Sequence, residues 1–184
     1  MIAIDRFDPF NDRLCRNVRN ALSEGFRDAL KNRDMQPLRS MADFFLKDAP
    51  PACIETYIRR RMAAYEEVLA DVSARCLEHP LDIAVAIWDR QLFFETHEYL
   101  EPYWMDAADD EKRLFQAMIR AAGTYVHLEQ GNRIGAGRIA GKAIAGLECT
   151  GRRLAPFADP QLLIKKLRKL DPIAPKLSGT GSHH

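Results

Sequence analysis

One stretch of the sequence combines residue types that could bind a metal ion or move a proton. Residues 93–104 include His97, Glu98 and Glu101. On a helix, His97 and Glu101 lie one turn apart on the same side, with Glu98 beside them. An imidazole and a carboxylate at this spacing could ligate one transition-metal ion, with Glu98 as a base for bound water and His127 as a third ligand. The candidate metal ligands are therefore His97, Glu101 and His127.

A polar ridge on the next helix could face this stretch. Gln116, Arg120 and His127 recur at helical spacing, with a gap at Gly123. If the two helices are antiparallel neighbours, the ridge meets the His-Glu group, and two tryptophans shield the cluster from water. The candidate ligand or polar-cluster residues are therefore His97, Glu98, Glu101, Gln116, Arg120, His127, Trp88 and Trp104.

The residues alone leave three interpretations of this cluster open. In the first, Arg120 pairs with Glu98 or Glu101 in a structural network that fixes helix register. In the second, the space over Gly123 holds a small polar ligand. A metal-dependent hydrolase that uses His97, Glu98, Glu101 and His127 is the alternative to both. The sequence therefore assigns no catalytic residue and no cofactor, and it leaves open whether the protein is an enzyme.

The remaining histidines and the cysteines add no second site. Two of the five histidines end the sequence Leu-Ser-Gly-Thr-Gly-Ser-His-His, which resembles the start of a purification tag. The four cysteines are scattered, without the spacing of a zinc site, and are expected to be buried, reduced thiols. They are Cys15, Cys53, Cys76 and Cys149.

The elements that position the candidate residues are all helical. Apolar residues recur every three or four positions between boundaries marked by proline and glycine. Gly131 and Asn132 predict a short turn between antiparallel helices, and Pro102 predicts a kink or a stop near Glu98. The predicted helices cover about residues 11–33, 37–46, 51–78, 81–104, 112–130, 133–149 and 160–170.

The fold class is therefore predicted as all-α, an antiparallel helical bundle with an additional N-terminal helical segment packed on it. We expect residues 1–80 to form the extension, residues 81–150 the bundle, and residues 151–184 a basic, proline-containing tail with one short helix, a loose end and the tag-like sequence. Four glycines in the last bundle helix predict close helix packing: Gly135, Gly137, Gly141 and Gly146. The expected core includes Phe93, Leu100, Trp104, Phe115, Met118, Ala122, Tyr125 and Ile139.

Several of these residues also form a pattern that resembles the domain-of-unknown-function family 309. The pattern consists of Trp88-Asp89, Leu92 to Glu98, Glu101 to Trp104, Phe115 to Ile119, His127-Leu128, Gly131-Asn132 and Gly135-Ala136. The resemblance covers about residues 81–147 and implies an all-helical bundle without an established activity. The chain departs from the family pattern at Ala117, where glycine is usual, and at Arg120, where glutamine is common.

Composition sets the remaining expectations. The chain has 184 residues, 27 Lys and Arg against 26 Asp and Glu, and 47% apolar residues, which favours a globular protein over a nucleic-acid binder. No apolar run approaches the roughly 20 residues that a bilayer requires. We therefore expect a cytoplasmic protein with no membrane partner and no nucleic acid. The expected partners are a small polar ligand and a second copy of the chain, which would pack through the apolar residues Phe44, Phe45 and Leu46.

Overall fold

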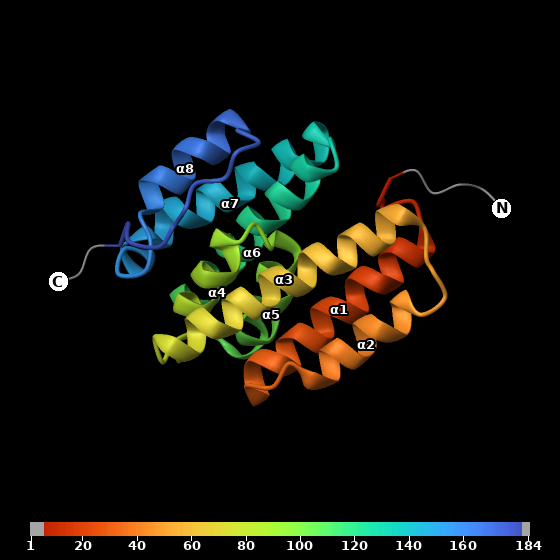
Figure 1. The fold of residues 1–184 in the computed structure, drawn as a ribbon. Coiled ribbons are helices and arrows are strands. Elements are labelled where there is room, and N and C mark those ends of the chain that lie inside the picture. Colours follow the sequence, from red (N-terminus) through yellow and green to blue (C-terminus); the bar gives the residue numbers. More distant parts are fainter. Residues whose placement is uncertain (1–5, 182–184) are drawn as a thin grey trace. The chain divides into compact units, whose positions relative to one another are not determined.

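The structure is a computed structural model that describes residues 6–181 (Figure 1). Within this range the protein is all-α, as predicted, with eight helices and no strand. None of these helices is both long enough and apolar enough to cross a bilayer. The helices are α1 (Arg13–Asn32), α2 (Gln36–Leu46), α3 (Ala52–Ala74), α4 (Pro80–Asp89), α5 (Phe93–Asp106), α6 (Asp109–Glu129), α7 (Arg133–Leu154) and α8 (Pro160–Lys169).

The chain divides into two compact units, Met1–Cys76 and Leu77–His184. In the first unit, Asp12 caps α1 by accepting a hydrogen bond from the backbone N–H of Cys15 at 2.7 Å. The apolar side of α1 buries Phe26, whose ring stacks on Tyr65 of α3 with the centroids 4.1 Å apart. Leu38 of α2 is buried against Gly25 of α1, so helices α1 to α3 share one apolar core.

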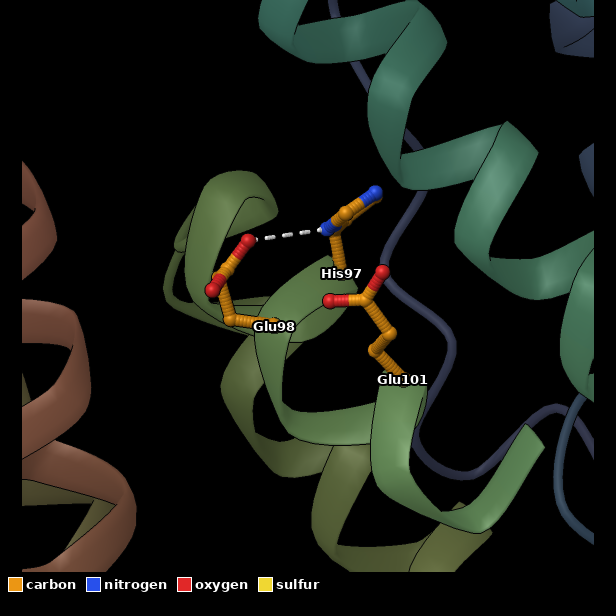
Figure 2. A group of neighbouring side chains, drawn as sticks. All are labelled: His97, Glu98 and Glu101. Atoms are coloured by element: carbon orange, nitrogen blue, oxygen red, sulfur yellow. Dashed lines mark hydrogen bonds and ion pairs between the residues drawn. The ribbon is translucent and has the colours of Figure 1, made fainter. Parts of the chain in front are cut away.

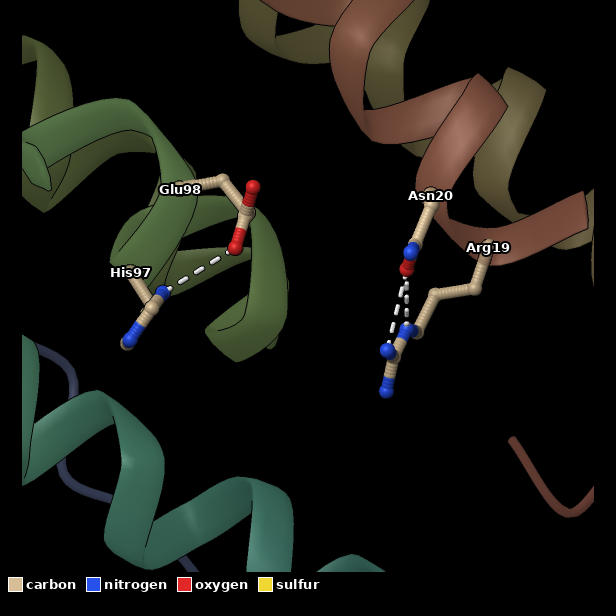
Figure 3. A network of polar contacts seen from close by, with 4 residues as sticks. All are labelled: Arg19, Asn20, His97 and Glu98. Carbon is tan, nitrogen blue, oxygen red and sulfur yellow. Dashed lines mark hydrogen bonds and ion pairs between the residues drawn. The ribbon is translucent and has the colours of Figure 1, made fainter. Parts of the chain in front are cut away.

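The polar side of α1 carries a local hydrogen-bonded pair. Nε and Nη2 of Arg19 donate to Oδ1 of Asn20 at 3.1 and 2.9 Å (Figure 3). On α2, Phe44 is exposed, while Phe45 and Leu46 are partly buried. The exposure of Phe44 is compatible with the predicted self-association, which stays a prediction.

The second unit contains α4 to α8, and its central helices are antiparallel. Gly146 of α7 packs on Ala117 of α6, and Gly135 packs on His127, so residue numbers rise along one helix as they fall along the other. The turn between the helices is the one predicted. Gly131 has a φ of 74°, and Oδ1 of Asn132 accepts a hydrogen bond from the backbone N–H of Gly135 at 2.8 Å.

The helix predicted over residues 81–104 is in fact two helices, α4 and α5. Gln91 lies in the left-handed region with a φ of 58°, which ends α4. Apolar residues continue on both sides of this break, so periodicity alone did not locate it. Pro102 lies inside α5, which runs on to Asp106 without the predicted stop. Three other helices differ from their predicted bounds by three residues or more. α3 ends at Ala74, four residues before the predicted end, α6 begins at Asp109, three residues before the predicted start, and α7 extends beyond Cys149 to Leu154.

Most of the predicted bundle core is buried. Trp104 and Ile139 are the two exceptions, because each is only partly buried. The ring of Trp104 lies under the ammonium group of Lys112, with Nζ 5.5 Å from the ring centroid. The buried members of the predicted set are Phe93, Leu100, Phe115, Met118, Ala122 and Tyr125.

The segment after α8, for which we expected a loose end, packs against the bundle unit. The indole Nε1 of Trp88 donates to the carbonyl of Pro175 at 2.9 Å. The carboxylate of Asp89 accepts hydrogen bonds from the backbone N–H groups of Leu177 at 2.7 Å and Ser178 at 3.0 Å. The side chain of Leu177 is fully buried. The first residues of the tag-like sequence are thus part of the fold, whereas His183 and His184 lie outside the described residues.

The cysteines differ in exposure, so the expectation that all four are buried was wrong. Cys15 is buried, and burial raises the pKa of its thiol to about 11, whereas Cys76 and Cys149 are exposed. We expect iodoacetamide at pH 8 to alkylate Cys76 and Cys149 within minutes and Cys15 only after unfolding, as measured by peptide mass spectrometry. Modification of Cys15 at the rate of Cys149 in the folded protein would contradict the burial of Cys15.

Candidate metal centre

Three of the candidate residues, His97, Glu98 and Glu101, lie within a turn and a half of α5. Thr96 Oγ1 donates to the carbonyl of Leu92 at 3.0 Å at the start of this helix. The buried side chains Phe93, Thr96 and Leu100 set the rotation of α5 about its axis. This rotation leaves His97, Glu98 and Glu101 half-buried, at the margin of the core.

The three side chains converge, as Figure 2 shows. One ligand atom from each of His97, Glu98 and Glu101 lies within 4.8 Å of the others. Nδ1 of His97 is 3.2 Å from Oε1 of Glu98. Ligand atoms that bind one ion at 2.0–2.2 Å lie up to about 4 Å apart, so small side-chain rotations would close the site. The two carboxylates would offset the charge of a divalent ion.

The polar ridge of α6 contributes less to this group than the sequence suggested. Gln116 and Arg120 are partly buried, and within residues 6–181 neither forms an ion pair or hydrogen bond with Glu98 or Glu101. His127 is not a member of the converging group. Its Nδ1 lies 2.7 Å from the place that a Cβ on Gly135 would occupy, so the imidazole packs against the first turn of α7.

The two tryptophans have separate surroundings. Trp88 is buried, and its ring meets the rings of Phe93 and Tyr125 edge to face, at interplanar angles of 75° and 86° and with centroids 5.0 and 5.2 Å away. Trp104 packs under Lys112 instead. Burial raises the pKa of Tyr125 well above its usual value, and the negative charge of Asp171 adds to the shift. Tyr125 therefore stays neutral and acts as part of the core.

Sequence reasoning missed the structural role of Asp89. This residue ends α4 and accepts two backbone hydrogen bonds from residues 177 and 178. Its partners are nearly ninety positions away in the sequence. Because every residue except proline has a backbone N–H group, no residue type identifies these donors. The Trp88-Asp89 pair was noticed only as part of the family pattern.

Comparison with known proteins agrees with the resemblance predicted from the sequence. A search of the curated proteins and a search of the solved structures each found no match. Residues 81–139 match the family DUF309, described as a domain of unknown function. The match covers α5, α6, most of α4 and the start of α7, including His97, Glu98 and Glu101. The part of the bundle unit that carries the candidate metal centre is therefore similar to DUF309.

Proposed function

We propose that α5 binds one divalent transition-metal ion through His97, Glu98 and Glu101. The observation that carries this proposal is the convergence of one nitrogen and two oxygen ligands within 4.8 Å on one side of a single helix. Imidazole together with carboxylates suits zinc, manganese or ferrous iron. Half-burial of all three side chains favours binding, because the ligands are ordered by the core and remain reachable from solvent.

Three protein ligands leave at least one coordination position for water or substrate, as in catalytic rather than structural zinc sites. A bound ion would polarise such a water, so the chemistry that the site supports is hydrolysis. In this proposal His97 and Glu101 are metal ligands, as their spacing predicts. Glu98 becomes a ligand in this proposal, instead of the separate base considered from the sequence.

A structural role without metal is the second candidate function. It is favoured by the 3.2 Å contact between Nδ1 of His97 and Oε1 of Glu98, which already gives the imidazole a partner. In this case the pair would help to hold α5 at the margin of the core. The two candidates differ in what happens when zinc is added.

Isothermal titration with zinc tests the proposal in a chain that carries His183→Ala and His184→Ala, because terminal histidines bind metal themselves. We expect one zinc ion per chain. His97→Ala should weaken binding by at least about 100-fold, since the loss of a direct ligand costs at least as much as the loss of a residue that supports one. Glu101→Gln should also weaken binding, and cobalt in place of zinc should give a visible absorption spectrum that His97→Ala abolishes.

Two histidine variants serve as controls. His79→Asn retains an N-cap for α4, because His79 caps that helix by accepting from the N–H of Leu81 at 3.2 Å, and it should bind zinc normally. His127→Gln should also bind normally if the ligands are those of α5 alone. Absence of stoichiometric zinc in the parent chain would contradict the metal proposal. The structural role would then be supported if His97→Ala lowered stability in metal-free buffer.

A further inference from the structure

We infer that the second unit binds another copy of this chain through two complementary surfaces at opposite ends of α6. The acidic end comprises Tyr103, Met105, Asp106, Asp109 and Glu111. The basic end comprises Arg133, Ile134, Arg138, Lys169 and Ile173. Contact of one chain's acidic end with its partner's basic end would cover apolar side chains and pair opposite charges. This inference is independent of the proposed metal site.

The acidic end lies where α5 passes into α6. Asp106, Asp109 and Glu111 are exposed, and among the described residues none of them forms an ion pair. Tyr103 and Met105 are 39% and 60% exposed beside them.

The basic side chains near the acidic end already interact with other groups of the same chain. Arg113 and Arg153 both pair with Asp110, at 3.4 and 3.7 Å. Lys112 donates to the carbonyl of Met105 and lies over the ring of Trp104. The three free carboxylates therefore remain to face a partner.

The basic end lies where α7 begins and α8 ends. Nη1 of Arg133 donates to the carbonyl of Leu170 at 3.4 Å, which fixes the start of α7 beside the end of α8 (Figure 1). Ile134 and Ile173 are 74% and 69% exposed at this place. Arg138 and Lys169 are exposed, and within residues 6–181 neither forms an ion pair.

Basic residues predominate at the basic end. Arg133, Arg138 and Lys169 are exposed, and residues 133–141 contain no acidic residue. Lys166 pairs with Asp171 at 2.7 Å, and Arg168 pairs with Glu148. The charge of Lys169 also acts on Asp171, but the side chains of Lys169 and Arg138 stay exposed and can meet a partner.

The two ends cannot meet within one chain. They lie at opposite ends of α6, which has 21 residues and is therefore about 30 Å long. The large, exposed apolar side chains of the described part of this unit all lie at these two ends. Such residues inside a charged rim are typical of protein interfaces, and opposite charges select the orientation.

A second copy accounts for both surfaces at once. An anionic lipid surface or a nucleic acid would cover the basic end only and would leave the acidic end, about 30 Å away, without a partner. In a second copy, the acidic end supplies the counter-charge and the apolar contact that the basic end requires. The contact joins different patches, so it can also propagate beyond a dimer.

Charge reversal and complementation test this inference by sedimentation velocity at 50 mM salt. The wild-type chain should associate at high micromolar concentration and dissociate in 500 mM salt. Arg138→Glu with Lys169→Glu should weaken association at least tenfold, and so should Asp106→Lys with Glu111→Lys. An equimolar mixture of the two double variants should associate again, because each retains the end that the other has lost.

A matched control reverses the same number of charges on the same two helices, nearer their middles. Lys142→Glu with Lys165→Glu should associate like the wild type, and circular dichroism should show that every variant is folded. A wild-type chain that stays monomeric at 500 μM in low salt would overturn the inference. A mixture of the two double variants that fails to associate would also overturn it, and so would a control variant that loses as much association as Arg138→Glu with Lys169→Glu. A chain that stays monomeric and instead sediments with anionic vesicles would overturn it as well.

Discussion

Leu177→Ala should lower the free energy of unfolding by about 2–5 kcal/mol, as expected when a fully buried leucine is truncated in a packed site. Leu177 is fully buried although only seven residues follow it in the sequence. Its backbone N–H donates to Oδ1 of Asp89, and its carbonyl accepts from Oγ1 of Thr180. The side chain thus fills a site that the surrounding backbone holds in place, and denaturation in urea would measure the loss.

Two further variants separate packing from hydrogen bonding at this site. Asp89→Ala removes the acceptor of two backbone N–H groups and should cost about 1–3 kcal/mol. Ser178→Ala keeps the backbone N–H that donates to Asp89 and should change stability by less than about 0.5 kcal/mol, because its side chain is exposed. If Leu177→Ala behaved like Ser178→Ala, the packing of this segment would be contradicted.

The sequence predicted helices well because their signals are local. Proline at the second position of α2, the cap at Asn132 and the left-handed Gly131 are each read from adjacent residues. The break between α4 and α5 was missed because Gln91, a residue with no strong turn preference, adopts the left-handed conformation there. The packing of the segment around Leu177 could not be predicted either, because it also has no local sequence signal.

In the candidate metal centre, too, only the part that depends on local sequence could be predicted. The convergence of His97 with Glu101 follows from helical spacing alone, so it could be predicted. The contributions of Arg120 and His127 depend on how α6 is rotated against α5, which one sequence does not reveal. The structure groups only the residues of α5 and packs His127 against Gly135. The part of the site that the sequence predicted is therefore the part that one helix can build alone.

The glycines of α7 show the same distinction. All four were expected to allow close packing, yet a Cβ on Gly141 would meet nothing within 4 Å, whereas a Cβ on Gly146 would lie 2.7 Å from Cβ of Ala117. Helical periodicity marks which glycines share a face, but it does not say which of them a neighbouring helix touches. This difference leads to opposite expected effects of the same substitution.

Gly146→Ala should destabilise the protein by about 1–3 kcal/mol, because α6 and α7 would have to separate around the added methyl group. Gly141→Ala should stabilise it by about 0.5–1 kcal/mol, because alanine restricts the unfolded chain and favours the helix. Both values come from chemical denaturation of single variants. Effects of equal sign at the two positions would contradict the close approach of α6 and α7 at Gly146.

Exchanging the two residues provides the strictest test of this contact. Gly146→Ala combined with Ala117→Gly moves the methyl group from α6 to α7 and leaves the space between the helices occupied as before. The helix propensities gained and lost, about 1 kcal/mol each, should nearly cancel. The double variant should therefore be more stable than Gly146→Ala alone, with a coupling energy of about 1 kcal/mol or more between the two positions. Simple additivity would mean that Ala117 does not limit how closely α7 packs.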